Sequence, residues 1–373
     1  MRGSGRAFVL SSLAALLVLS AVVLLRQEVA LAEPDSSPHA DHPAASGGIG
    51  AATGGGTALP RIDCTGGYTA SVYAAGLVAP DGLAFDPNGV LYVAEEMAGR
   101  ISQVGAGGSI TPVITGLTNP EGIAFDDAGS LYIVEDAQAG RLIKRTSDSL
   151  TTTLAADLDA PEGVVWTPDG TLYVTESNAE FVTDLTALQT RIASVSPSGA
   201  VSRIITNTPT IDGADVAFWS YAGITVGPDG SLYVTNELAG VERSYVVVPG
   251  FTLTLHITDS VFTVDPSAGT RRPFASGLAS PEGLRFSADD GFPLYVAEED
   301  IGGGAGRLSR VGPDGSHSPL CTGFFSIEDV AVDQSGWLYV SEDTSGLVIR
   351  IRPSEPVEPG DHRVWLPLVL RQG

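Results

Sequence analysis

A unit that recurs six times between residues 80 and 343 constrains the fold of this chain more than any other feature. Four copies are plain: PDGLAFDPNGVLYVAEE (80–96), PEGIAFDDAGSLYIVED (120–136), PEGVVWTPDGTLYVTES (161–177) and PEGLRFSADDGFPLYVAEE (281–299). Two weaker copies are YAGITVGPDGSLYVTNE (221–237) and IEDVAVDQSGWLYVSED (327–343). In each copy an alternating apolar stretch, a tight turn and a second apolar stretch predict two antiparallel strands, A and B, joined by a hairpin.

Two further strands, C and D, follow the hairpin, as in GRLI (140–143) and TPVITGL (111–117). Four antiparallel strands in each repeat predict the blades of a β-propeller, because each blade buries its faces only against its neighbours. No strand D follows the last strand C (346–352), whereas YTASVYAAGL (68–77), before the first copy, has the pattern of a strand D. We therefore expect an all-β, six-bladed propeller over 61–352, closed by the N-terminal strand in blade six.

The two ends of the chain have different compositions from the repeats. Arg2 and Arg6 precede an apolar run over 7–25 and the small residues of 30–32, which predicts a signal peptide over 1–32 or, as the alternative, an uncleaved N-terminal anchor. Residues 33–60 have the Pro, Gly and Ser content of a disordered linker. We expect a secreted, extracellular protein, with cell-surface association through the anchor or the C-terminal tail.

The C-terminal segment 353–373 is a Pro-rich spacer followed by an apolar stretch too short to span a membrane. A sorting or docking tail and an additional edge strand are the two interpretations, of which the first is favoured. We expect no transmembrane segment beyond the N-terminal signal.

The charge balance limits the partners of the protein. The formal net charge is −24, and removal of a signal peptide containing Arg2, Arg6, Arg26 and Glu28 would make it more negative. Such a surface repels nucleic acid and anionic lipid and attracts cations. We expect a monomer that binds neutral or cationic partners and no nucleic acid.

Cys64 and Cys321 are the only cysteines of the chain. An even count in an exported protein favours a disulfide, and two buried thiols are the alternative. The repeats place Cys64 just before strand D of blade six and Cys321 in strand D of blade five, so that a disulfide would join adjacent blades where the ring closes.

The long connections gather on one face of the predicted ring. In a four-stranded meander the D-to-A and B-to-C connections share a face, and the additional length at 177–190, 207–220 and 238–260 falls on these connections. Long loops on a rigid scaffold often carry binding sites. We expect a small-molecule, glycan or protein ligand on this loop-bearing face.

Acidic residues recur on the same face in two sets. The strand A set, predicted to hold metal, consists of Asp81, Glu121, Glu162, Glu282 and Glu328, with Ala222 in blade four. The strand B set, predicted to bind ligand, consists of Glu95, Glu135, Glu176, Asn236, Glu298 and Glu342. Oxygen donors with no thiolate and almost no His favour a hard cation, Ca²⁺ before Mg²⁺. The alternative is that the acids, above all the strand B set, only cap turns and accept backbone N–H groups.

The repeat unit resembles that of the NHL and SMP-30/gluconolactonase group of six-bladed propellers, and it is most similar to secreted propellers of the ScyD/ScyE type. The resemblance covers about residues 68–352 and implies a TolB-like or NHL-type propeller. In the SMP-30 group a divalent metal lies at the top of the channel, held at the position after the Pro of this motif, which implies the strand A set here. Residues 161–166 match that segment best. The family uses a few dissimilar ligands, whereas nearly every blade here carries the same acid, and this difference argues against its lactonase chemistry.

Other propeller enzymes fit less well. Quinoprotein sugar dehydrogenases need a catalytic His and basic residues for pyrroloquinoline quinone (PQQ), so we expect no PQQ at this acidic mouth. Streptogramin-lyase-like propellers also need a His, and His256 and His317 lie outside the repeat motifs. Two hypotheses remain: a non-catalytic binding or scaffold propeller, which is favoured, and a metal-dependent lactonase or ester hydrolase. Blade four, with Ala222, Asn236 and long insertions, is the place where we expect function.

Overall fold

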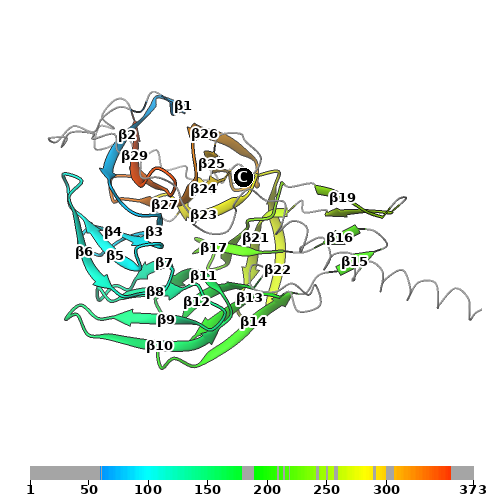
Figure 1. Cartoon of the computed structure of the whole chain (residues 1–373), viewed down its shortest axis with the longest axis horizontal. Coiled ribbons are helices and arrows are strands. Elements are labelled where there is room, and N and C mark those ends of the chain that lie inside the picture. The colour runs from blue at the N-terminus through cyan, green and yellow to red at the C-terminus, as the bar shows by residue number, and fades with distance from the viewer. Residues whose placement is uncertain are drawn as a thin grey trace, which may run out of the picture.

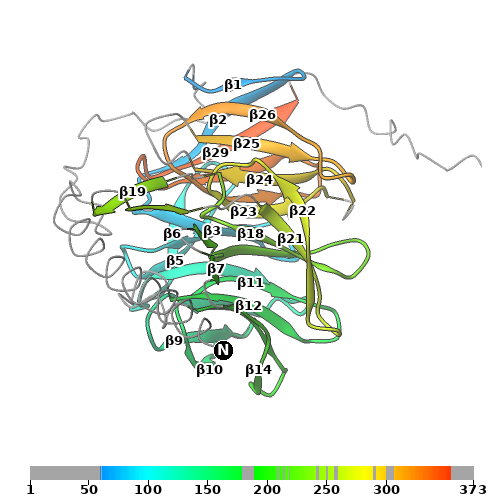
Figure 2. The ribbon, with the colours of Figure 1, turned by 90° about the vertical axis from the view of Figure 1, so that its right-hand side faces the viewer.

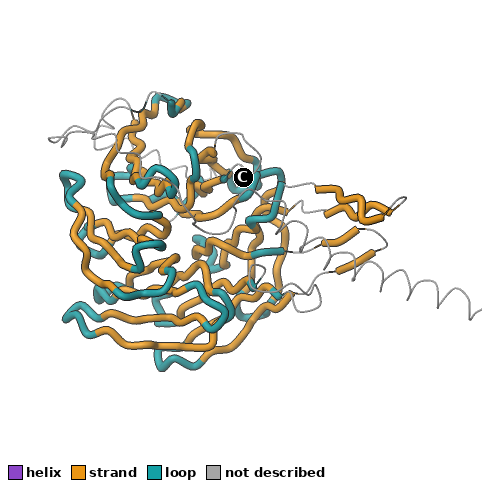
Figure 3. Tube along the Cα trace, viewed as in Figure 1, coloured by secondary structure: helices purple, strands orange, loops and turns teal. Residues whose placement is uncertain are grey.

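The computed structural model describes residue 59 and residues 61–353, apart from 179–188, 208–209, 213–214, 218, 241–242, 249–250, 256–258, 289–290 and 300–305. The predicted signal peptide, nearly all of the predicted linker and the predicted tail beyond residue 353 lie outside the described residues. All regular elements in the described part are β-strands (Figure 3). Consequently no helix there is long and apolar enough to cross a membrane.

Six four-stranded antiparallel meanders form the blades of a propeller (Figure 1). Blade one is β3 (Pro80–Phe85), β4 (Leu91–Glu95), β5 (Arg100–Val104) and β6 (Ile110–Thr115). Blade two is β7 (Pro120–Phe125), β8 (Leu131–Glu135), β9 (Gly140–Arg145) and β10 (Thr151–Leu158). Blade three is β11 (Pro161–Trp166), β12 (Leu172–Ser177), β13 (Thr190–Val195) and β14 (Val201–Asn207).

The second half of the ring repeats this pattern. Blade four is β17 (Tyr221–Val226), β18 (Leu232–Asn236), β21 (Asp259–Asp265) and β22 (Thr270–Ser276). Blade five is β23 (Pro281–Phe286), β24 (Leu294–Glu298), β25 (Gly306–Val311) and β26 (His317–Phe324). Blade six is β27 (Ile327–Val332), β28 (Leu338–Glu342), β29 (Leu347–Pro353) and β2 (Tyr68–Ala75). The predicted fold class is confirmed.

The ring closes through the N-terminal segment, as predicted. β2 pairs antiparallel with β29, with Tyr68 opposite Pro353 and Ala75 opposite Leu347. The short β1 (Asp63–Cys64) adds a fifth strand to blade five by pairing with β26 (Figure 2). Cys64 lies opposite Cys321 and is joined to it by a disulfide with an S–S distance of 2.07 Å. One short segment thus fastens blade five and completes blade six.

The core lies between the blades, because each sheet packs its faces on its neighbours. At the closure, Leu83 and Val93 of blade one share an apolar cluster with Tyr339 and Val348 of blade six. Leu83, Val93 and Val348 are fully buried. Burial of each such side chain stabilises the fold by roughly 1.5–3 kcal/mol. The same arrangement in each repeat explains why a single blade cannot be stable alone.

Each strand A begins with a β-bulge that explains the P-[DE]-G pattern. Between Pro80 and Leu83 two residues of β3 oppose one residue of β4, and the register shifts at the equivalent place in all six blades. A Cβ at Gly82 would lie 2.3 Å from the carbonyl oxygen of Glu121 in the next blade. Only glycine therefore fits where one bulge packs on the next.

Blade six has Asp329 in the place of this glycine. Asp329 Oδ2 accepts a hydrogen bond of 2.9 Å from the backbone N–H of Leu83, and this contact joins the last blade to the first. Burial raises the pKa of Asp329, and Arg285 opposes this shift. The departure from the repeat thus occurs at the junction where the ring closes.

The two insertions around blade four form a small sheet of their own. β15 (Thr210–Asp212) and β16 (Asp215–Ala217) precede β17, whereas β19 (Arg243–Val248) and β20 (Phe251–Leu255) follow β18. The strand order is β15-β16-β20-β19, with β16 and β20 parallel. Figures 1 and 3 show this sheet outside the ring of blades. The two connections, which the sequence presents as separate long loops, are therefore paired with each other.

Candidate functional site

The strand B set is buried and bound to the protein itself. Glu298 is 1% exposed and accepts hydrogen bonds from Ala279 N (2.7 Å), Arg307 Nη2 (2.6 Å) and Arg307 Nε (2.9 Å). Its Oε1 also contacts the hydroxyl of Ser309. Ala279 lies in the connection that leads into strand A of the blade, and Arg307 lies on strand C. The carboxylate thus fastens this connection to its own blade, and we name this arrangement the connection latch.

The latch recurs with different arginines. Its other members are Glu95 with Val78 N and Arg100, Glu135 with Thr118 N and Arg141, Glu176 with Asp159 N and Arg203, and Glu342 with Phe325 N and Arg61. The arginine comes from strand C in blades one, two and five, from strand D in blade three, and from the segment before β1 in blade six. These contacts match the structural alternative, in which the acids accept backbone N–H groups. A ligand-binding role for the strand B set stays a prediction.

Asn236 performs the same task in blade four without a charge. Its Oδ1 accepts from Ser220 N (2.9 Å) and its Nδ2 donates to Asp259 O (3.0 Å). Strand C of this blade, β21, begins with Asp259 and offers no arginine at this end. Strand C supplies no arginine to a carboxylate here, whereas an amide supplies both an acceptor and a donor. Asn236 therefore fastens the connection without a charge, and its ligand-binding role stays a prediction.

The strand A set lies at the bulges around the central channel. Strands A of adjacent blades contact one another in ring order, from β3 through β7, β11, β17, β23 and β27 back to β3. The carboxyl groups are half-buried. A bulge redirects the side chain that it carries, which explains why the acid at this position leaves the face of the blade.

Burial and mutual repulsion raise the pKa values of these channel acids. Burial is the largest cause, followed by a neighbouring acid: Glu96 for Asp81, Glu237 for Glu162 and Glu282, and Glu299 for Glu328. Members of the set also act on one another, since Glu282 raises the pKa of Glu162 and Asp81 raises that of Glu282 and Glu328. Asp81, Glu162, Glu282 and Glu328 therefore act on one another electrostatically, and a metal-binding role for the strand A set stays a prediction.

A third acidic set was missed by the sequence reasoning. It consists of the residues that follow the strand B set in the sequence: Glu96, Asp136, Glu237, Glu299 and Asp343, with Ser177, the last residue of β12, in blade three. Ser326 Oγ lies 2.7 Å from Glu299 Oε1 and 2.9 Å from Glu328 Oε1, which joins this set to the strand A set. The signal was present in pairs such as Glu95-Glu96 and Glu298-Glu299, because successive side chains of a strand point to opposite sides. The first acid of each pair belongs to the connection latch, and the second raises the pKa of a strand A acid at the channel.

The donor chemistry of the channel suits a hard cation. Its described donors are carboxylate oxygens, which Ca²⁺ and Mg²⁺ prefer. Within the described ranges, no group of three or more His, Cys, Asp or Glu side chains is already arranged to hold a metal ion. Binding of an ion would therefore need the side chains to draw together. His317 lies on β26, with Nε2 3.1 Å from Ser276 O, and His256 lies outside the described residues.

Comparison with known proteins defines the class of fold. No protein-family model matches the sequence, and no curated protein matches it either. Among solved structures, a gluconolactonase from Xanthomonas campestris is 16% identical with a TM-score of 0.58, over 77% of this chain and 90% of that chain. The PQQ domain of pyranose dehydrogenase from Coprinopsis cinerea is 14% identical with a TM-score of 0.58, over 78% and 97%.

A third similar structure is a putative oxidoreductase (glucose dehydrogenase) from Thermus thermophilus, which is 21% identical with a TM-score of 0.52, over 77% of this chain and 100% of that chain. At these identities the likeness concerns the fold alone. The protein is a six-bladed β-propeller whose structural neighbours include gluconolactonase-like propellers. The closer resemblance to the ScyD/ScyE type stays a prediction.

Proposed function

We propose that this protein binds a divalent cation, Ca²⁺ before Mg²⁺, at the acidic mouth of its channel, together with a neutral or cationic ligand, as a binding or scaffold protein without catalysis. The observation that carries the proposal is the meeting of two acidic sets, which raises the pKa values of Asp81, Glu162, Glu282 and Glu328. Like charges that cannot separate are stabilised either by protons or by a cation.

The connection latches support this interpretation, because they pair the nearby arginines with strand B carboxylates and not with the channel acids. Arg100 and Arg307 are paired with Glu95 and Glu298, so these positive charges are already matched by strand B carboxylates. The net charge of −24 also attracts cations toward the mouth. These pairings and the acidic net charge favour an external cation at the channel.

The test is thermal unfolding of chelator-treated protein with added Ca²⁺, Mg²⁺, Mn²⁺ or Zn²⁺ at matched ionic strength. Ligand at a hundredfold excess over its Kd stabilises the folded state by about 2.7 kcal/mol. We expect Ca²⁺ to raise the Tm of the native protein and to have a smaller effect on Glu282→Gln and Glu328→Gln. Asp127→Asn is the matched control, since Asp127 is an exposed acid in an A-to-B turn on the opposite face. Equal Tm values with and without each cation would count against the proposal.

We also propose that the protein is exported. The apolar run before residue 26 and the disulfide between Cys64 and Cys321 support this location, because disulfides persist in oxidising compartments. Mass spectrometry of the protein from its native cells tests the proposal. A mature N-terminus near residue 33 is the expected result, and an intact N-terminus in the cytoplasmic fraction would contradict it.

A metal-dependent lactonase or ester hydrolase is the second candidate function. Carboxyl groups with raised pKa values can act as general acids, and a bound cation would polarise a carbonyl. The gluconolactonase from Xanthomonas campestris, which shares the fold, makes lactones the first substrates to test. A lactone panel with each of the four cations, measured by pH-stat, separates the candidates. Turnover that is lost in Glu162→Gln supports the hydrolase function. Lactone hydrolysis no faster than in buffer would exclude that function for the lactones tested.

A further inference from the structure

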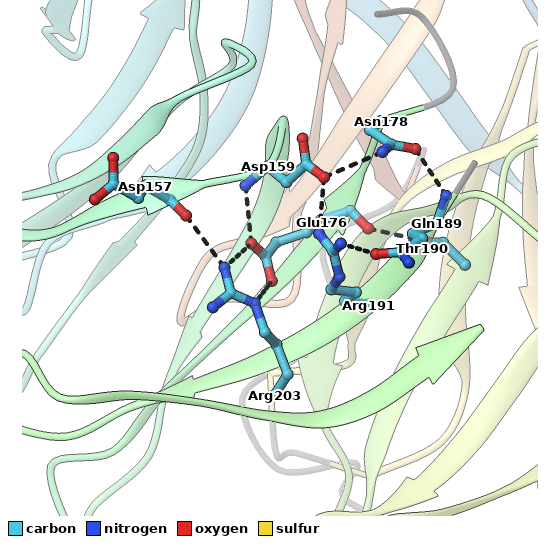
Figure 4. Close-up of polar contacts among 8 residues, drawn as sticks. All are labelled: Asp157, Asp159, Glu176, Asn178, Gln189, Thr190, Arg191 and Arg203. Atoms are coloured by element: carbon cyan, nitrogen blue, oxygen red, sulfur yellow. Dashed lines mark hydrogen bonds and ion pairs between the residues drawn. The ribbon is translucent and has the colours of Figure 1, made fainter. Parts of the chain in front are cut away.

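A polar pocket lies at the rim of the ring, away from the channel. It has a volume of about 440 Å³ and is lined by Gln138, Ala139, Asp157, Asp159, Arg191 and Arg203. Asp157 lies near the end of β10, the outermost strand of blade two, and Arg203 lies on β14, the outermost strand of blade three. The rim pocket therefore spans two neighbouring blades, on the side of the D-to-A and B-to-C connections. Figure 4 shows four of its lining residues, Asp157, Asp159, Arg191 and Arg203.

Asp157 departs from the repeat at a strained position. Four other blades have glycine there with positive φ: Gly76 (90°), Gly116 (80°), Gly277 (88°) and Gly323 (98°). Asp157 adopts a φ of 56°. Aspartate tolerates this left-handed region better than most residues with a side chain, but less well than glycine. The aspartate thus carries a conformational cost that glycine would avoid.

The carboxylate of Asp157 is exposed and has no hydrogen bond or ion pair to the described residues, whereas its backbone oxygen accepts from Arg203 Nη2 (3.1 Å). Figure 4 shows this side chain directed away from Arg203. The charge of Asp157 therefore contributes nothing to the described fold and is available to a ligand.

The two arginines of the pocket are each held by a carboxylate of the protein. Arg203 donates Nη2 (2.9 Å) and Nε (3.2 Å) to Glu176, and its Nη1 has no partner among the described residues. Arg191 Nη1 donates to Asp159 Oδ2 (2.8 Å), and Asn178 Nδ2 donates to the same oxygen (3.1 Å). Each guanidinium is thus fixed and matched by a carboxylate, which leaves Asp157 as the unmatched charge.

The lining selects a ligand class by its hydrogen-bonding groups. Asp157 and Asp159 accept, Arg203 and Gln138 donate, and Ala139 is the one apolar lining residue. An anion would be repelled by Asp157 and by the net charge, whereas an organic cation would leave the free Nη1 donor of Arg203 without an acceptor. Hydroxyl groups both donate and accept, so a neutral polyhydroxyl compound satisfies this mixed lining. We propose that the rim pocket binds a neutral sugar unit, with one hydroxyl donating to Asp157 and another accepting from Arg203 Nη1.

The volume agrees with this class, because small-molecule sites span roughly 300–1,000 Å³. The proposal is independent of the proposed channel function, since no strand A residue takes part. Chelation should therefore leave sugar binding unchanged even if it abolishes cation binding at the channel.

The test is saturation-transfer NMR and titration calorimetry with neutral mono- and disaccharides, with glucuronate and glucosamine as charged controls. Asp157→Gly restores the residue of the other blades, so we expect it to fold with equal or higher stability and to bind the sugar about 10- to 100-fold more weakly. Asp157→Asn keeps a residue that tolerates the left-handed region and should also bind more weakly. Asp127→Asn removes one charge from the opposite face and should bind like the native protein.

Three results would overturn the proposal. One is equal affinity of the native protein and Asp157→Gly for the sugar. Another is no binding of any neutral sugar by protein that is folded by circular dichroism. The third is a preference for glucuronate or glucosamine over neutral sugars, which would show that the pocket recognises charge.

Discussion

Replacement of Glu298 by alanine tests whether the connection latches stabilise the ring. Glu298 is 1% exposed, and its loss would leave Ala279 N and the buried hydroxyl of Ser309 without their acceptor. Removing one partner of a buried ion pair typically costs about 3–5 kcal/mol. The side chain of Arg307 is 33% exposed and can turn toward water, which lowers the expected cost to about 3 kcal/mol.

The assay is equilibrium unfolding in urea at neutral pH with the disulfide intact. A double-mutant cycle with Arg307→Ala separates the coupling between the two side chains from the loss of the backbone contact. Glu298 and Arg307 contact each other directly. We therefore expect the unfolding free energy lost in the two single variants, added together, to exceed the loss in the double variant. Additive effects would mean that the pair contributes little.

Asn236→Asp is the complementary change in blade four. It replaces the amide that donates to Asp259 O by a carboxylate, in a place where strand C offers no arginine. We expect a loss of about 2 kcal/mol or more, because a buried charge is left without a partner. Unaltered stability of Asn236→Asp, or a loss below about 1 kcal/mol in Glu298→Ala, would refute the reasoning.

Three further predictions concern the channel, the closure and the bulges. Without divalent cations, the unfolding free energy should fall as the pH rises from about 4 toward neutral. The reason is that the channel acids have raised pKa values in the folded protein, so the unfolded chain loses its protons first as the pH rises. Urea unfolding at several pH values checks this prediction, and an unfolding free energy that rises with pH would contradict it. Cys64→Ser with Cys321→Ser should lower the unfolding free energy by about 2–5 kcal/mol, measured against the oxidised protein, and an unchanged value would exclude a stabilising disulfide. Gly122→Ala should cost about 1–3 kcal/mol because its Cβ would lie 2.4 Å from Glu162 O, whereas Gly107→Ala has open space and should be neutral in the same unfolding assay. The channel acids of the first prediction are Asp81, Glu162, Glu282 and Glu328.

The fold was predictable because its signals are local and repeated. The turn residues and the alternation in 80–96 define one hairpin, and the other copies confirm the pattern independently. The closure of the ring by residues 68–77 was predictable because the last repeat lacks a strand D and the N-terminal segment supplies one additional strand. The pairing of Cys64 with Cys321 stayed open, because the sequence allowed buried thiols as well.

The candidate site was less predictable because it depends on which way each side chain points. Glu95 and Glu96 are the same residue type, and the register of strand B directs the first to Arg100 and lets the second raise the pKa of Asp81. The sequence shows that both are acids but not which of them faces the arginine. Asn236 stands where strand C offers no arginine and donates to Asp259 O, and its ligand-binding role stays a prediction. The pairing of β16 with β20 joins separate insertions, which no local pattern indicates.

The central claim is that the channel acids hold a divalent cation, and anomalous diffraction tests it most directly. Crystals grown with Mn²⁺ in place of Ca²⁺ would be measured near the manganese absorption edge. We predict an anomalous peak in the channel, coordinated by oxygens of the strand A set that include Glu282 or Glu328. A channel without such a peak, in which the carboxyl groups are hydrogen-bonded to one another, would contradict the account.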